Sequence, residues 1–134
     1  MGTQTYLGSC HCGKVRFEAD FDLAAGSGKC NCSICTKLRA WGTIMKPSQF
    51  RLLAGENDTS TYVWGAGISK RHFCRHCGVH VYGVGHLAEV GGDFCSVNLA
   101  TLDIDAETLA SIPVRYFDGR NDQWETPPTV TGHL

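Results

Sequence analysis

The residues best suited to chemistry are three cysteines in one short stretch, Lys29-Cys30-Asn31-Cys32-Ser33-Ile34-Cys35. Their C-x-C-x-x-C spacing can direct three sulfur atoms toward one centre. Three thiolates on Zn²⁺ leave one tetrahedral position free, an arrangement typical of catalytic rather than structural zinc. The alternatives are buried free thiols or one arm of an ordinary zinc knuckle, and this triplet (Cys30, Cys32 and Cys35) does not decide among them by itself.

Two cysteine pairs lie elsewhere in the chain, Cys10-His11-Cys12 and Cys74-Arg75-His76-Cys77-Gly78. A C-x-x-C followed by glycine is typical of a zinc knuckle, because the tight turn directs backbone N–H groups at the sulfurs and glycine accepts the positive φ that such turns need. A thioredoxin-like redox pair would instead be followed by a helix. Residues 79–82 alternate between apolar and polar like a strand, so a metal site is favoured.

The clustered cysteines can be shared between metals in two ways. The two pairs can form one four-thiolate site, which leaves the triplet as the open one. Alternatively, Cys32 and Cys35 can join Cys74 and Cys77 as in a zinc ribbon, which strands the first pair. The first grouping uses all seven clustered cysteines and is modestly favoured. The eighth, Cys95, has no cysteine neighbour and is expected to be a packed core thiol.

The segments that must position these cysteines are predicted to be mostly short strands and turns. Residues 14–19 alternate strictly, as in a half-buried strand, and an extended backbone at Cys10 and Cys12 would place both sulfurs on one side. Sixteen glycines against four prolines also indicate a β-rich chain with many tight turns. Residues 21–28 are expected to form a loop and 118–128 a polar tail. Further strands are predicted at 41–46, 50–54, 59–64, 79–82, 94–99 and 114–117, with short helices at 33–39 and 105–111.

Length and composition indicate one domain whose core does not depend on metal merely because the chain is small. The chain has 134 residues, 43% of them hydrophobic, and a formal charge of −1, which provides no general affinity for nucleic acid or for an anionic membrane. No apolar run is long enough to span a bilayer, and no secretory signal is visible. We therefore expect a cytoplasmic protein with reduced thiols, in which eight cysteines indicate metal or redox chemistry rather than disulfides.

Three motifs carry a resemblance to a known family: G-S-C-H-C-G-K-V-R-F-E, C-N-C-S-I-C-T-K and F-C-R-H-C-G-V-H-V-Y. They resemble the glutathione-dependent formaldehyde-activating enzyme family, also called the centromere protein V domain. The similarity continues through F-R-L-L-A-G-E, V-N-L-A-T-L-D and F-D-G-R-N-D-Q-W, so that it covers residues 6–124. Centromere protein V itself acts on microtubules and chromatin, but it carries a basic extension that this chain lacks.

The resemblance implies a mainly β fold, a β-tent of coiled antiparallel sheets with two zinc ions, here a single domain over residues 6–128. It implies a structural zinc on Cys10, Cys12, Cys74 and Cys77 and a catalytic zinc on Cys30, Cys32 and Cys35. It also implies a carbon–sulfur lyase that joins formaldehyde to glutathione or cleaves S-hydroxymethylglutathione. The segments that hold glutathione in the longer family members cannot be matched in this chain residue by residue.

The residues themselves are compatible with a thiol substrate. A zinc held by three thiolates is a soft centre that favours a fourth sulfur ligand and lowers the pKa of a bound thiol. The basic residues Lys37, Arg39, Lys70 and Arg71 can bind the carboxylates of a peptide-like thiol, although each is individually expected to be a solvated surface charge. Candidate general acids or bases are His72, His76 and His80. No glutamate stands beside the triplet and no proline precedes the C-x-x-C, so a nucleobase deaminase is disfavoured.

Two classes of function therefore remain. The first is a zinc enzyme acting on adducts of a thiol and a carbonyl compound, or another enzyme of the same family with a different small substrate. The second is a zinc-stabilised binding or scaffold domain without catalysis. The partner expected in the first case is a small thiol or thiol adduct such as glutathione, with neither nucleic acid nor membrane involved.

Overall fold

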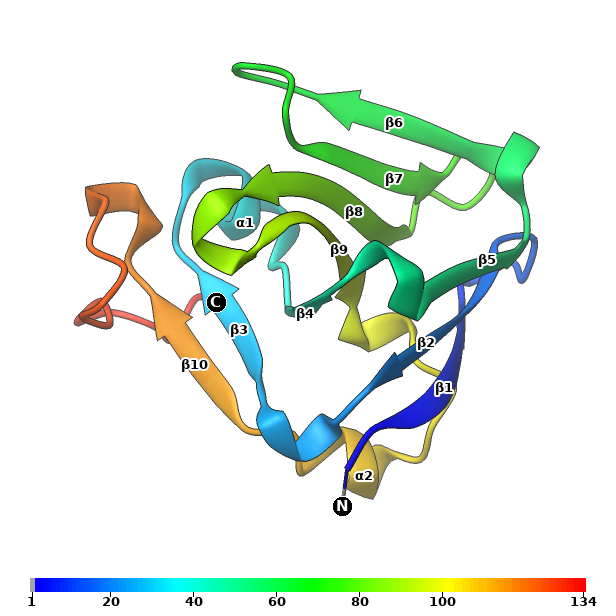
Figure 1. Cartoon of the computed structure of the whole chain (residues 1–134), viewed down its shortest axis with the longest axis horizontal. Coiled ribbons are helices and arrows are strands. Elements are labelled where there is room, and N and C mark those ends of the chain that lie inside the picture. The colour runs from blue at the N-terminus through cyan, green and yellow to red at the C-terminus, as the bar shows by residue number, and fades with distance from the viewer. Residues whose placement is uncertain (1) are drawn as a thin grey trace.

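The computed structural model describes residues 2–134, which fold into two β-sheets with few helical turns (Figure 1). The helices are α1 (Ser33–Leu38) and α2 (Ala106–Ala110). The strands are β1 (Gln4–Ser9), β2 (Arg16–Phe21), β3 (Ser27–Cys30), β4 (Gly42–Met45), β5 (Phe50–Ala54), β6 (Thr59–Val63), β7 (Lys70–Cys74), β8 (His80–Leu87), β9 (Gly92–Asn98) and β10 (Val114–Phe117).

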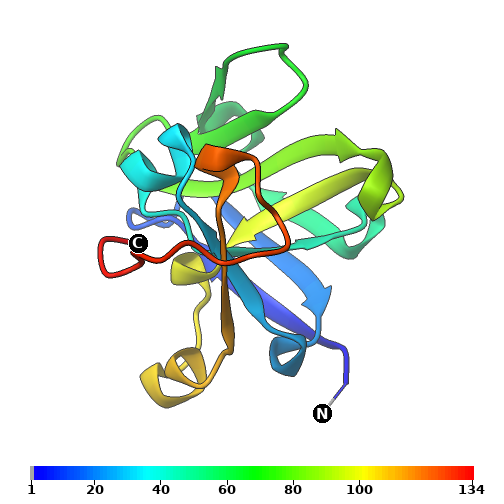
Figure 2. The same ribbon diagram turned by 90° about the vertical axis from the view of Figure 1, so that its left-hand side faces the viewer.

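The larger sheet has seven strands in the order β10-β3-β4-β9-β8-β7-β6, and the smaller has three in the order β1-β2-β5. The predicted mainly β, single-domain fold is thus confirmed. The strand neighbours are antiparallel except β3 and β10, which run parallel with Val114 opposite Ser27. Figure 2 shows that side of the molecule, where β10 leads into the C-terminal segment. The parallel pair places both strand ends, Cys30 and Phe117, at the same edge.

The core confirms the alternation predicted for residues 14–19. Val15, Phe17 and Ala19 are fully buried, while the residues between them face outward. The Phe17 ring stacks on Phe50 at 5.3 Å between centroids, and Phe50 stacks on Tyr82 at 4.6 Å. Phe17 and Phe50 belong to the three-stranded sheet and Tyr82 to the seven-stranded one, so the Phe50–Tyr82 contact joins the two sheets.

Cys95 is 2% exposed in the same core, as predicted for a packed thiol. Burial raises its pKa to about 12, which keeps the sulfur protonated. It therefore has neither the thiolate character nor the access that metal binding and nucleophilic chemistry require.

Two expectations about local structure were wrong for part of their range: residues 27–28 lie in a strand and residues 118–120 pack on the triplet turn, whereas residues 121–127 are exposed. The segment 21–28, expected to be a loop, contains the start of β3, which has little intrinsic strand preference. Tertiary contacts hold it instead, since Ser27 N–H donates to Pro113 O at 2.7 Å and an added Cβ on Gly28 would lie 2.9 Å from Phe117. The segment 118–128 is not simply a tail, as the site below shows.

Other elements agree with the sequence. Strands β5 and β10 have the predicted limits, and Asp105 caps α2 by accepting from Thr108 N–H at 2.7 Å. No helix in residues 2–134 is both long enough and apolar enough to span a membrane.

Candidate metal sites and the pocket beside them

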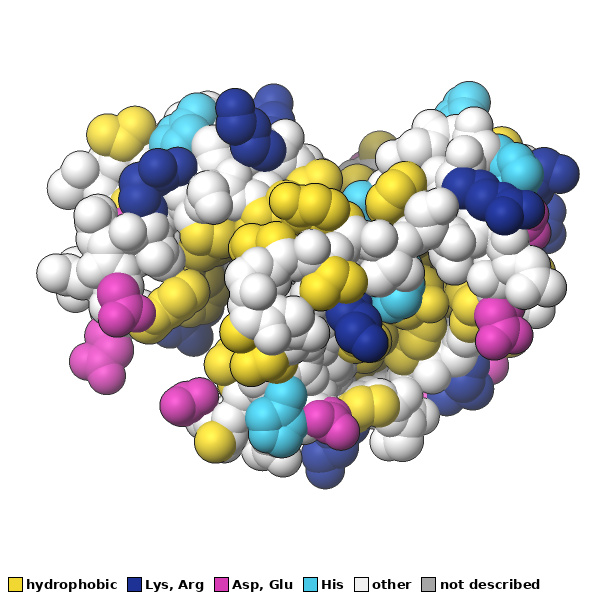
Figure 3. Space-filling model, turned by 90° about the horizontal axis from the view of Figure 1, so that it is seen from above, with side chains coloured by type: hydrophobic (Ala, Val, Ile, Leu, Met, Phe, Trp, Pro, Cys, Tyr) yellow, Lys and Arg dark blue, Asp and Glu magenta, His cyan; other side chains and the backbone are white. Residues whose placement is uncertain are grey.

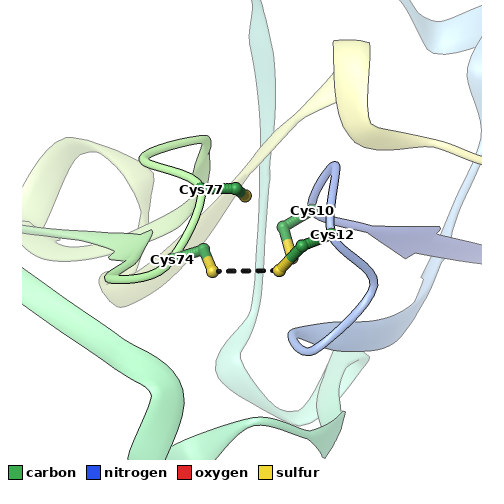
Figure 4. A group of neighbouring side chains, drawn as sticks. All are labelled: Cys10, Cys12, Cys74 and Cys77. Carbon is green, nitrogen blue, oxygen red and sulfur yellow. Dashed lines mark hydrogen bonds between the residues drawn. The ribbon is translucent and has the colours of Figure 1, made fainter.

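Four cysteines from two distant turns converge on one point (Figure 4). Cys10 and Cys12 lie in the turn after β1, Cys74 is the last residue of β7, and Cys77 lies in the turn that follows it. The Sγ–Sγ distance is 3.6 Å both from Cys10 to Cys12 and from Cys12 to Cys74. Tetrahedral zinc with Zn–S bonds of about 2.3 Å separates its sulfurs by about 3.8 Å. The spacing and the all-thiol donor set of this four-cysteine cluster therefore fit a closed zinc site.

The turn at Cys74–Gly78 has the geometry predicted for a zinc knuckle. Gly78 has φ +77° and donates its N–H to Cys74 O at 2.8 Å, while His76 N–H points at Cys74 Sγ at 3.4 Å. Backbone N–H groups of Cys12 and Val79 lower the pKa of Cys77 to about 6. Backbone N–H groups from both turns of the cluster thus favour the thiolate form of Cys77.

The turn at Cys10–Gly13 differs from the extended backbone expected there. Gly13 N–H donates to Cys10 O at 3.2 Å and closes a tight turn. Val15 N–H then points at Cys10 Sγ at 3.3 Å. The two sulfurs still face the same way, but a turn rather than strand alternation brings Cys12 beside Cys10.

The triplet is assembled locally where β3 meets α1. Cys30 ends β3, Cys32 is the residue that precedes α1, and Cys35 lies in the first turn of that helix. Their sulfurs all lie within 4.8 Å of one another, and Cys32 N–H points at Cys30 Sγ at 3.4 Å. Within residues 2–134 no fourth His, Cys, Asp or Glu joins this group at that distance. The donor set fits a soft metal with one open coordination position.

A cation stands beside the triplet. Arg71, on β7, places Nη2 3.6 Å from Cys35 Sγ. Hydrogen bonds from the Cys30 and Cys35 thiols lower the pKa of Cys32, and the Arg71 charge acts in the same direction. At least one thiolate is therefore stabilised in the triplet before any metal binds.

The C-terminal segment fixes the turn that carries the triplet, a contact the sequence did not indicate. Asn31, 7% exposed, donates from Nδ2 to Asp118 Oδ1 at 2.8 Å and accepts at Oδ1 from Arg120 N–H at 3.0 Å. An added Cβ on Gly119 would lie 2.5 Å from Cys30 Sγ, so only glycine fits there. Residues 118–120 therefore act as a brace, not as the predicted polar tail.

A pocket of about 380 Å³ opens beside the triplet. Cys30 and Cys35 lie on its wall, as do two residues whose polar atoms are discussed next, Arg71 and His80. The rest of the wall is largely apolar, with its large side chains coming from Trp41, Ile44, Phe94 and Phe117. A volume of this size suits a small molecule.

Arg71 and His80, which line this pocket, each have one buried nitrogen without a hydrogen-bond partner among the described residues, Arg71 Nε and His80 Nε2. Leaving such an atom unpaired is costly, so a polar ligand atom or a water bound to either nitrogen would be stabilising. Burial, and secondly the Arg71 charge, lower the pKa of His80 to about 4. His80 is therefore neutral at pH 7, so that its unprotonated ring nitrogen can accept a hydrogen bond.

The hairpin β6–β7 positions Arg71. The guanidinium lies over the Trp64 ring, 5.4 Å from its centroid, and Trp64 stacks on Tyr62 at 5.8 Å. Exposed apolar side chains, including Tyr62 and Ile68, belong to this hairpin. In the view from above, hydrophobic side chains occupy much of the middle of the face (Figure 3).

The other histidines proposed from the sequence are engaged elsewhere. His76 Nε2 pairs with Asp58 at 2.7 Å on the surface. His72 hydrogen-bonds Thr61 at 3.0 Å through Nδ1 and stacks on Tyr82 at 4.5 Å. Of the three candidates, the structure brings only His80 to the pocket.

The basic candidates divide in the same way. Lys37 and Lys70 are exposed, and Arg39 donates to Leu134 O at 3.3 Å. Only Arg71 lines the pocket. A basic residue missed in the sequence, Lys29, also lines it, with Nζ 5.9 Å from the centroid of the Trp41 ring.

Comparison with known proteins agrees with this architecture. The sequence model of the family described as "Glutathione-dependent formaldehyde-activating enzyme" matches residues 5–117. A crystal structure of a Rhodobacter sphaeroides protein is similar in fold, with a TM-score of 0.67 and 27% sequence identity. That similarity covers 81% of this chain and 99% of the other.

Proposed function

Because the chain belongs to the glutathione-dependent formaldehyde-activating enzyme family, we propose that it is a zinc-dependent carbon–sulfur lyase acting on adducts of a thiol and a small aldehyde. S-hydroxymethylglutathione, the adduct of glutathione and formaldehyde, is the reference compound for this reaction. One observation carries the proposal: the open triplet borders a pocket that buries two unpaired nitrogens, Arg71 Nε and His80 Nε2.

In this proposal the two cysteine clusters have different roles. Cys30, Cys32 and Cys35 hold the catalytic zinc, whereas Cys10, Cys12, Cys74 and Cys77 hold a structural zinc. When bound at the triplet, zinc supplies a soft Lewis acid that stabilises the substrate sulfur as a thiolate. We take the functional domain as residues 6–128, because the brace at 118–120 lies just beyond the region that the family model matches.

The side chains of the pocket supply the remaining chemistry. Arg71 Nε donates a hydrogen bond to the adduct oxygen, and neutral His80 accepts the hydroxyl proton at Nε2. The oxygen electron pair then forms the C=O bond as the C–S bond breaks, and that bonding pair stays on sulfur. The products are the aldehyde and the thiolate, and the proton on His80 returns to solvent or to the released thiol.

The test is a screen of thiol–aldehyde adducts with the zinc-loaded protein, measuring aldehyde release. We expect turnover of at least one adduct, its loss in Cys32→Ser, and a reduction of at least about tenfold in His80→Gln. Arg71→Met should also reduce turnover, whereas its matched control Lys70→Met, which removes an exposed charge next to Arg71 in sequence, should retain activity. A metal-loaded protein that processes no adduct would favour the scaffold function.

A further inference from the structure

The pocket beside the triplet offers few free polar groups along its length. Trp41 Nε1 donates to Ser27 Oγ at 2.7 Å, and that hydroxyl donates to Pro113 O at 2.8 Å. Asn98 donates from Nδ2 to His80 O at 2.7 Å and accepts at Oδ1 from Ala100 N–H at 3.2 Å. Ser27, Trp41 and Asn98 are thus occupied by the protein itself, which leaves the small hydroxyls of Thr43 and Ser96 as the other neutral polar side chains of the wall among the described residues.

The buried nitrogens without a partner among the described residues belong to two side chains of the pocket wall. Arg71, whose Nη2 is near Cys35 Sγ, and His80 hold the two unpaired buried nitrogens. Ile44 lies on β4, which is separated from β8 by β9 in the sheet, and it is a 49% exposed part of the pocket wall. The pocket is therefore polar where the sulfur and its neighbouring oxygen would lie and apolar beyond them.

Glutathione does not match this distribution. It carries two carboxylates, one ammonium group and two amides, and each needs a partner when it leaves water. The only basic side chains on the pocket wall are Arg71, at the triplet end, and Lys29, and no Asp or Glu lines the pocket in residues 2–134 to receive the ammonium.

We propose that the thiol partner of this protein is a compact aryl or alkyl thiol, whose apolar body lies against Trp41, Phe94 and Ile44. Its sulfur faces the triplet, and the adduct oxygen faces Arg71 and His80. This inference rests on the proposed function, because it assumes that a thiol binds at the open metal position, but it specifies a different substrate class from the one in the family's name.

The experiment measures thiol binding rather than turnover. Protein loaded with Co²⁺ is titrated with 2-phenylethanethiol, 2-mercaptoethanol and glutathione, and the visible absorbance of the cobalt is followed. We expect the half-saturating concentration of 2-phenylethanethiol to be at least about tenfold below that of 2-mercaptoethanol, because burying the phenyl ring is favourable. Glutathione should bind no better than 2-mercaptoethanol.

The outcomes separate the two proposals. A spectrum that no thiol changes would contradict the proposed function itself. Glutathione binding more tightly than 2-mercaptoethanol, or no advantage for the phenyl thiol, would leave that function standing and overturn the apolar substrate class.

A matched pair of variants tests where the apolar part of the thiol lies in the pocket. Ile44→Lys places a charge at the pocket wall, and Ile68→Lys makes the same change at a comparably exposed position, 57%, in the β6–β7 hairpin. We expect Ile44→Lys to weaken 2-phenylethanethiol binding at least about threefold more than 2-mercaptoethanol binding, and Ile68→Lys to change neither. Equal effects on the two thiols would overturn the placement of the ligand body along this wall.

Discussion

The two cysteine clusters use similar ligands for different structural purposes. The four-cysteine cluster joins segments far apart in the chain, with Cys12 and Cys74 separated by 62 residues. The triplet lies within one local stretch, between Cys30 and Cys35. A metal in the first cluster would link distant parts of the fold, whereas a metal in the second would order only one turn.

Their surroundings differ just as much. Cys10 and Cys74 are 3% and 0% exposed, and backbone N–H groups point at their sulfurs. The triplet has a pocket on one side, and its turn is fixed by Asn31 and the brace. A site that joins distant segments and fills all four coordination positions suits a structural metal. A site with a free coordination position, held in place by residues outside its own turn, suits a reactive metal.

The largest expected effect comes from removing a ligand of the four-cysteine cluster, which joins distant parts of the chain. Cys74→Ser should cost more than about 3 kcal/mol of unfolding free energy, or prevent soluble expression, because metal binding at such a site is coupled to folding. Cys32→Ser should cost less than about 2 kcal/mol and remove one metal ion per chain. Thermal unfolding with metal analysis measures both, and equal melting temperatures would remove the distinction between the clusters.

The rate of metal release should also differ between the two cysteine clusters. We expect two zinc ions per chain, with a chelator removing one at least about tenfold faster, since only the triplet has an open coordination position. Colorimetric detection of released zinc measures the two phases, and added thiol should slow the fast phase alone. Single-phase release of both ions would contradict the structural and catalytic assignments.

His80 should make the triplet side of the molecule acid-sensitive. Its pKa of about 4 lies below the ordinary value of 6.5, so between these pH values the unfolded chain binds more protons and stability falls as pH falls. A full shift is worth about 3 kcal/mol, so the native protein should lose about 2–3 kcal/mol more than His80→Gln between pH 7 and 4. Denaturant titrations across pH measure this.

The exposed residue His86 provides the control for that series. His86→Gln should keep the acid sensitivity of the native protein. The His86→Gln and His80→Gln variants should both lose metal in acid to the same extent, so that metal loss does not account for a difference between them. Identical pH dependence of native protein and His80→Gln would show that the buried imidazole is not held neutral by the fold.

The smallest expected effect is at the brace. Asn31→Ala removes a buried side chain with hydrogen bonds to Asp118 and Arg120, so it should cost about 1–2 kcal/mol and speed metal loss from the triplet. Asn121→Ala, an exposed residue that also bonds Asp118, should cost less than about 0.5 kcal/mol. Faster release from the four-cysteine cluster instead would contradict the role of the brace.

Much of this protein was predictable from local sequence. Cysteine spacing predicted the triplet and the knuckle, because ligands two to three residues apart share one turn and need no distant partner. Strict alternation over residues 14–19 predicted which side chains enter the core, and the Asp105 cap predicted the start of α2. The resemblance then predicted the grouping of Cys10 and Cys12 with Cys74 and Cys77, which the structure brings within reach of one another.

Only the tertiary structure decided which charged and polar residues face the triplet. Three histidines and four basic residues were equal candidates in the sequence. The sheet selected Arg71, which lies on the face of β7 opposite to Lys70 and His72, and His80, which begins the neighbouring strand β8. The strand β3 and the brace were likewise not predictable from the sequence. Ser27 and Gly28 form a strand because they pair with β10, and Asp118 belongs to the brace because it binds Asn31. Local spacing determines ligands that share a turn, whereas a pocket is formed by segments whose proximity depends on the packing of the whole chain.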